Sequence, residues 1–131
     1  MDIVLDSYSL IAFFDNETGA DKVGEILKQA NNKQRFLYLS VVNWGEVYYV
    51  SFRKNGKGVA DDTMRNIESL PIEIVPVDRE ITQVAAELKA NYRMSYADTF
   101  AAALAMQKKA QLVTGDREFK QVEHDIKIIW L

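Results

Sequence analysis

Four acidic residues lie in surroundings that usually exclude a charge: Asp6, Glu46, Asp98 and Asp116. Asp6 ends an apolar run, Glu46 interrupts two apolar and aromatic runs, Asp98 precedes an alanine-rich stretch, and Asp116 follows an apolar run and a glycine. Buried acids are rare unless they are paired or bind a metal ion. Converging carboxylates repel one another, and a divalent cation relieves that repulsion. The four acids therefore predict metal-dependent chemistry on phosphate.

Each acid also has a purely structural interpretation. Asp6 is a suitable N-cap for a helix over residues 7–14, and capping is compatible with metal binding because such a helix N-terminus attracts anionic groups. Asp98 fits the first turn of a helix, where the helix dipole favours an acid, and Asp116 fits a turn. Glu46 is harder to explain in this way, because its neighbours are almost all apolar or aromatic. The coincidence of all four favours a shared site.

Short apolar runs alternate with helical patterns along the chain. Candidate strands cover 3–5, 36–39, 72–75, 111–113 and 127–130, and candidate helices cover 7–14, 21–30, 42–52, 58–70, 81–92 and 96–109. This alternation predicts an α/β fold, in which helices flank a central, mostly parallel sheet of about five short strands. Ligands of such sheets bind beyond the carboxyl ends of the strands, where Asp6 and Asp116 are expected. Glu46 and Asp98, from helices, can lean over the same crevice.

The composition indicates one domain over residues 1–131, with enough hydrophobic residues (48%) for a core. Cysteine is absent, which excludes disulfides, zinc thiolate sites and cysteine nucleophiles. No apolar run approaches the roughly 20 residues that span a bilayer. The first residues lack the basic region and cleavage site of a signal peptide, so we expect a cytoplasmic protein that does not enter a membrane.

A net charge of −3 excludes a simple polycationic nucleic-acid binder. A local basic patch with bridging metal ions still allows an acidic protein to hold phosphates. Arg53, Lys54 and Lys57 form the densest basic cluster and are candidate RNA contacts, although ordinary solvation explains them equally well. Lys108 and Lys109 are expected to complement a helix dipole.

The aromatic and histidine residues carry weaker signals. Core packing is the expected role of four aromatic residues, of which one or two can alternatively stack on bases: Trp44, Tyr48, Tyr49 and Phe52. His124, the only histidine, lies in a polar stretch and is expected at the surface. With one histidine and no cysteine, a histidine-rich metal site is excluded.

Four segments together resemble the motifs of PIN-domain ribonucleases, close to the VapC-type toxins of toxin–antitoxin pairs. Residues 3–7 resemble the family's opening strand with its acid and hydroxyl residue. Residues 40–47 resemble the second motif, with its acid on a helix, and residues 95–105 and 112–119 resemble the third and fourth. Each motif is degenerate alone, but their order and spacing match over nearly the whole chain.

The resemblance implies a PIN-like α/β/α sandwich in which the four acids hold one or two Mg²⁺ or Mn²⁺ ions. Ser7 and Thr114 would offer hydroxyl hydrogen bonds to a ligand acid or to a water on the metal. The implied activity is endonucleolytic cleavage of single-stranded or looped RNA that leaves a 5′-phosphate and a 3′-hydroxyl. The implied partners are a cognate antitoxin and a second copy of the chain. Trp44 and Gly45 depart from the family pattern, which more usually has smaller or aliphatic residues there.

Two alternatives remain open from the residues. The first is an aspartyl-phosphate protein, either a small phosphatase or a receiver domain. A haloacid-dehalogenase-type phosphatase needs an acid two residues after its nucleophile, where this chain has Tyr8, and the receiver's phosphoacceptor would have to be Asp78, which also suits an N-cap. The second is a non-catalytic PIN-like module that binds RNA or a protein.

Overall fold

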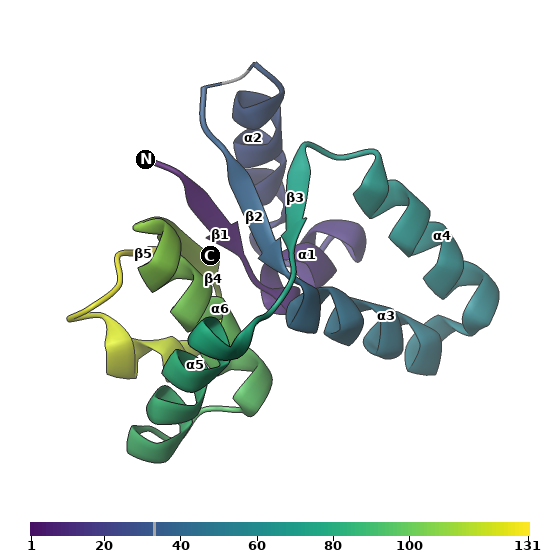
Figure 1. Ribbon diagram of the computed structural model, residues 1–131. Helices are drawn as coiled ribbons and strands as arrows, with labels where there is room; N and C mark the ends of the chain where they lie inside the picture. Colours follow the sequence, from purple (N-terminus) through teal and green to yellow (C-terminus); the bar gives the residue numbers. More distant parts are fainter. Residues whose placement is uncertain (33) are drawn as a thin grey trace.

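Five parallel strands form the centre of the fold (Figure 1). The computed structural model describes residues 1–32 and 34–131. The strands are β1 (Ile3–Leu5), β2 (Leu37–Ser40), β3 (Ile72–Val75), β4 (Gln111–Thr114) and β5 (Ile128–Trp130). Their order across the sheet is β3-β2-β1-β4-β5, so the chain builds outward from β1 in one direction and then returns to the other side of it. The carboxyl ends of β1 and β4 are therefore neighbours at the point where the order reverses.

Helices cover both faces of this sheet. They are α1 (Ser7–Phe14), α2 (Ala20–Asn31), α3 (Val41–Asn55), α4 (Lys57–Glu68), α5 (Arg79–Asn91) and α6 (Tyr96–Lys108), with a 3₁₀ helix η1 at Arg117–Val122. Buried side chains of α5, α6 and η1 share one core, and those of α2, α3 and α4, with Leu10 of α1, share the other. The expected α/β/α sandwich with a parallel sheet is confirmed.

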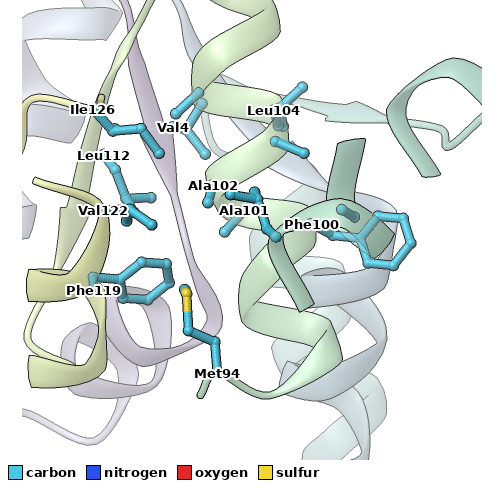
Figure 2. Close-up of a cluster of buried hydrophobic side chains, with 14 of the residues drawn as sticks. Val4, Met94, Phe100, Ala101, Ala102, Leu104, Leu112, Phe119, Val122 and Ile126 are labelled. Atoms are coloured by element: carbon cyan, nitrogen blue, oxygen red, sulfur yellow. The ribbon is translucent and has the colours of Figure 1, made fainter. Parts of the chain in front are cut away.

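Alternation along the strands divides the two cores. Ile3 and Leu5 point to the core on the α2 side, whereas Val4 between them points to the α6 side. Figure 2 shows Val4 close to Ala102 of α6 in the core on the α6 side. Residues 101–105 are all buried, and the alanines among them let α6 lie close to the sheet. Close packing brings the first turn of α6, with Asp98, to the edge where β1 and β4 end.

The structure corrects several sequence-based boundaries and adds one element. η1 was not predicted, because a six-residue 3₁₀ segment is too short to show a helical period. Helix α3 continues to Asn55, where Gly56 with a φ of 86° ends it, rather than stopping at residue 52. Helix α4 stops at Glu68 and not at residue 70. The remaining boundaries agree within one or two residues.

The aromatic residues of α3 are only partly in the core. Trp44 and Tyr48 pack against the core on the α2 side, as expected. Tyr49 and Phe52 are 46% and 43% exposed, so the prediction of core packing is wrong for these two. The reason is visible in Figure 1, where α3 and α4 extend together beyond the sheet. Among the described residues, no helix is both long and apolar enough to cross a membrane.

Candidate active site

Asp6 lies directly after β1 and caps α1. Its Oδ1 accepts a hydrogen bond from the backbone N–H of Ser9 at 2.8 Å, and the hydroxyl of Ser9 accepts one from the backbone N–H of Asp6 at 3.1 Å. Its Oδ2 accepts from the Thr114 hydroxyl at 2.5 Å. The side chain is 1% exposed. Asp6 therefore combines the structural role of a cap with a fixed carboxylate at the sheet edge.

Thr114, the last residue of β4, connects Asp6 to the next acid. While its hydroxyl donates to Asp6, its oxygen accepts from the backbone N–H of Asp116 at 3.0 Å. Asp116 Oδ1 accepts from the backbone N–H of Glu118 at 2.9 Å, which starts η1. The hydroxyl of Thr114 thus fixes the relative positions of two acids that come from neighbouring strands.

Glu46 reaches the same edge from α3. Its Oε1 accepts from the Ser7 hydroxyl at 2.9 Å and from Nδ2 of Asn43 at 2.9 Å. Asn43 Nδ2 also donates to the carbonyl of Ala97 at 3.2 Å, which joins α3 to the first turn of α6. Asn43 is fully buried, and its Oδ1 has no hydrogen-bond partner among the described residues.

Asn43 was not predicted as a site residue. The sequence does contain a signal for it: Asn43 is a polar residue among mostly apolar neighbours and precedes Glu46 by one helical turn, so the two side chains share a face of the helix. The structure shows that this amide orients Glu46 and positions Asp98 indirectly, through the backbone of its helix.

Three carboxylates at the exposed side of the site lie close to one another. One oxygen each of Asp98, Asp116 and Glu118 lies within 4.8 Å of the other two, and the residues range from buried Asp98 to exposed Glu118. Glu118 was not predicted as a site residue, although it belongs to the segment 112–119. Residues two positions apart do not usually have neighbouring side chains. The side chains of Asp116 and Glu118 lie close together here because the 3₁₀ helix η1 starts between them.

The charges of the four predicted acids act on one another. Burial raises the pKa of Asp98 to about 7, and the charges of Asp116, Asp6 and Glu46 add to the rise in that order. Burial likewise raises the pKa of Asp6 to about 6, against the opposing hydrogen bonds from Thr114 and Ser9, and the charge of Asp116 contributes. The structure therefore brings all four predicted acids into one electrostatic group.

This group suits a divalent cation. The donors are carboxylate oxygens, which Mg²⁺ and Mn²⁺ prefer. A cation would also replace the unfavourable burial and mutual repulsion of these carboxylates with attraction. The raised pKa values of Asp98 and Asp6 are the observation that supports this fit.

The PIN domain family model matches residues 3–125, which is most of the chain. This chain belongs to the PIN-domain family. The resemblance noted from the four segments is thereby confirmed. No curated protein sequence gives a significant match.

Solved structures of toxin–antitoxin proteins are similar to this PIN domain. Rickettsia felis VapBC2 bound to a promoter DNA fragment matches with a TM-score of 0.78 and 18% identity over 98% of each chain. DNA-bound VapBC from Salmonella typhimurium matches with a TM-score of 0.74 and 17% identity, over 98% of this chain and 97% of that one. Mycobacterium tuberculosis VapC20, a sarcin–ricin loop cleaving toxin, matches with a TM-score of 0.73 and 15% identity. The match covers 92% of this chain and 95% of that one. At these identities the similarity concerns the fold.

The predicted basic cluster of the PIN domain has partners within the chain. Lys54 lies 2.9 Å from Asp15, and Lys57 lies 2.8 Å from Asp61. The Arg53 guanidinium lies over the ring of Tyr49, 5.1 Å from its centre. None of the three belongs to the hydrogen-bonded network of the acids, and their contact with RNA stays a prediction.

Lys108 and Lys109 lie at the opposite end of α6 from Asp98. Lys108 is in the last turn of α6, as expected, and its ammonium is 4.7 Å from the centre of the Tyr38 ring. Lys109 ends that helix in the left-handed conformation. The side chain of His124 is 60% exposed and lies 3.1 Å from Asp125, which confirms its place at the surface.

The position of Asp78 argues against a receiver domain. A receiver requires its phosphoacceptor after a middle strand, but β3 is at the edge of this sheet. Asp78 caps α5 by accepting from the backbone N–H of Ile81 at 3.0 Å. It has the plain capping role that the sequence allowed.

Proposed function

We propose that this PIN domain is a Mg²⁺- or Mn²⁺-dependent endoribonuclease that hydrolyses phosphodiester bonds of RNA. The observation that carries the proposal is the electrostatic group of Asp6, Glu46, Asp98 and Asp116, where β1 and β4 end. Burial of Asp6 and Asp98 beside two further acids destabilises the metal-free fold, and carboxylates with such raised pKa values are concentrated at functional sites. Asp116 is partly exposed and Glu118 is exposed, so the group is accessible to a polymer on that side.

The protein's residues divide the work of such a site. Asp98, Asp116 and Glu118 are spaced to hold a cation, and Asp6 and Glu46 complete its surroundings. When bound, a divalent cation supplies neutralisation of the phosphate charge and a water of lowered pKa. Thr114 and Ser7 donate to Asp6 and Glu46, which keeps one oxygen of each carboxylate in a fixed direction.

RNA as substrate and an antitoxin as partner are supported by the similar structures. One of them is described as a sarcin–ricin loop cleaving toxin, and others are VapBC toxin–antitoxin complexes. By analogy, we propose that this chain is the toxin of a type II pair, with a cognate antitoxin and a homodimeric state. Arg53, Lys54 and Lys57 remain candidate contacts for the RNA backbone.

Cleavage assays test the activity. Protein purified free of antitoxin should cleave a structured RNA pool in Mg²⁺ or Mn²⁺, stop in EDTA, and leave 5′-phosphate and 3′-hydroxyl ends. Asp116→Asn should lose this activity. The matched control is Glu25→Gln, which removes an exposed acid of α2 that is not part of the acidic group. The Oε1 of Glu25 lies 3.7 Å from the Nζ of Lys28. Equal cleavage in EDTA would refute the metal mechanism, and RNA binding without cleavage in Mn²⁺ would support the non-catalytic alternative.

Growth and sedimentation experiments test the biological role. Induction of this chain alone should slow growth of a host, and co-expression of a partner encoded directly upstream should restore it. Normal growth with active protein present would contradict the toxin role. A monomer throughout the micromolar range in analytical ultracentrifugation would contradict the homodimer.

A further inference from the structure

Tyr8 is a large aromatic residue at the rim of the acidic group. It follows Ser7, which donates to Glu46, and it is 45% exposed. The hydroxyl end of its ring occupies the space beside Gly115, where a Cβ would lie 2.3 Å from Cε1 and 2.6 Å from Cζ of Tyr8. Gly115 stands between Thr114 and Asp116. The ring therefore rests against the segment that carries two site residues, and any larger residue at position 115 would displace it.

A shallow cavity adjoins this ring. Tyr8 lines it together with Ile11, Glu17 and Thr18, and its volume is about 360 Å³. The ring and Ile11 supply apolar surface, whereas Glu17 and Thr18, in the turn after α1, supply polar groups. The carboxylate of Glu17 repels phosphate and only accepts hydrogen bonds. The cavity is thus suited to an uncharged, flat group that carries hydrogen-bond donors.

We propose that Tyr8 is a stacking platform for a nucleobase next to the cleaved bond, and that Glu17 accepts a hydrogen bond from an amino group of that base. This inference rests on the proposed function and adds a specificity determinant to it. Stacking on an aromatic ring tolerates every base, because every base has a π-face. Glu17 then favours adenine, cytosine and guanine over uracil, because uracil has no exocyclic amino group and its N3–H donor lies between two carbonyl oxygens that repel a carboxylate.

Binding experiments test the platform separately from catalysis. Fluorescence anisotropy with short single-stranded oligo(A), oligo(C) and oligo(U) is measured in Ca²⁺, and a gel verifies that the RNA stays intact. Tyr8→Ala should weaken binding of oligo(A) and oligo(C) about 5- to 100-fold, the usual effect of losing one stacked base. Tyr8→Phe should bind like the wild type, because it keeps the ring. In cleavage assays the loss should appear mainly in KM.

Two further variants sharpen the test. Phe36→Ala removes an exposed aromatic residue (70%) just before β2, at the amino ends of the strands and away from the acids, and should leave binding unchanged. Glu17→Gln can donate as well as accept, so the preference for oligo(A) and oligo(C) over oligo(U) should shrink or vanish. If Tyr8→Ala melts below the assay temperature, Tyr8→Leu replaces it, since leucine keeps apolar bulk without an aromatic face.

The outcomes separate this inference from the proposed activity. Equal binding by wild type and Tyr8→Ala, or an equal loss in Tyr8→Phe or Phe36→Ala, overturns the platform while RNA cleavage by the wild type still supports the nuclease. Binding that depends on Tyr8 without any cleavage supports the platform and overturns the nuclease. A wild-type protein that neither binds nor cleaves RNA overturns both.

Discussion

Replacing Asp98 by asparagine keeps the side-chain shape and removes one charge from the acidic group. The pKa of Asp98 is raised to about 7 from the 3.8 of an ordinary aspartate, chiefly by burial and then by three neighbouring acids. At pH 8, ionisation of Asp98 in the metal-free fold therefore costs up to roughly 4 kcal/mol, because each pKa unit corresponds to about 1.36 kcal/mol. Solvent beside partly exposed Asp116 and exposed Glu118 screens part of this cost, so we expect Asp98→Asn to recover roughly 1–2 kcal/mol.

The helix dipole opposes this gain by a smaller amount. Asp98 lies in the first turn of α6, where loss of an acid costs about 0.3–1 kcal/mol. The N-cap itself survives, because Ser95 accepts from the backbone N–H of Asp98 and not from its side chain. Glu80→Gln is the matched control, since Glu80 is an exposed first-turn acid of α5 outside the site. It should lower stability by the dipole contribution alone.

Two measurements on each variant decide the role of Asp98. Metal-free Asp98→Asn should melt a few degrees above the wild type, at roughly 3 °C for each kcal/mol, whereas Glu80→Gln should melt slightly below it. Cleavage by Asp98→Asn should fall by orders of magnitude, since weaker metal binding removes both charge neutralisation and water activation, and the melting temperature should no longer rise with Mn²⁺. An active but less stable Asp98→Asn protein would remove Asp98 from the site and refute the reasoning from converging acids.

Three other perturbations test the same site. The contribution of Asp6 and Asp98 to metal-free stability should fall as pH rises from about 4 to about 7, because their folded pKa values of about 6 and about 7 exceed the unfolded 3.8, so that the folded state binds more protons there. A melting series should show this slope reduced in Asp98→Asn, and an equal slope would contradict it. Asn43→Ala should lower the free energy of unfolding in urea by about 1–3 kcal/mol and slow cleavage at least tenfold, because Glu46 loses a hydrogen-bond donor and α3 loses its hydrogen bond to α6. Cleavage at the wild-type rate would show that Asn43 does not position Glu46. Gly45→Ala should raise the free energy of unfolding by about 0.5–1 kcal/mol and leave cleavage unchanged, because a Cβ at this mid-helix position meets open space. A loss of stability would mean that the helix needs its glycine.

Local patterns in the sequence determined the elements and the identity of most site residues. Each strand candidate is a short apolar run, and most of the helices show the spacing of a buried face, so their alternation implied a parallel sheet with helices on both faces. Asp6, Glu46 and Asp116 were visible because each interrupts or follows an apolar run, and Asp98 because it precedes an alanine-rich stretch. The caps of α3 and α6 are equally local, because serine is a favoured N-cap residue and both Ser40 and Ser95 accept from helix N–H groups.

The tertiary structure decided which of these residues meet. The bond between Thr114 and Asp6 joins residues 108 positions apart, and it exists because the chain returns to place β4 beside β1. The roles of Asn43 and Glu118 depend on the packing of α3 against α6 and on the turn of η1, and neither leaves a periodic trace. Tyr49 and Phe52 were assigned to the core because their helix is apolar, yet that helix extends past the sheet. Periodicity reports which face of an element avoids water, but the partner of that face depends on strand order and helix length in three dimensions.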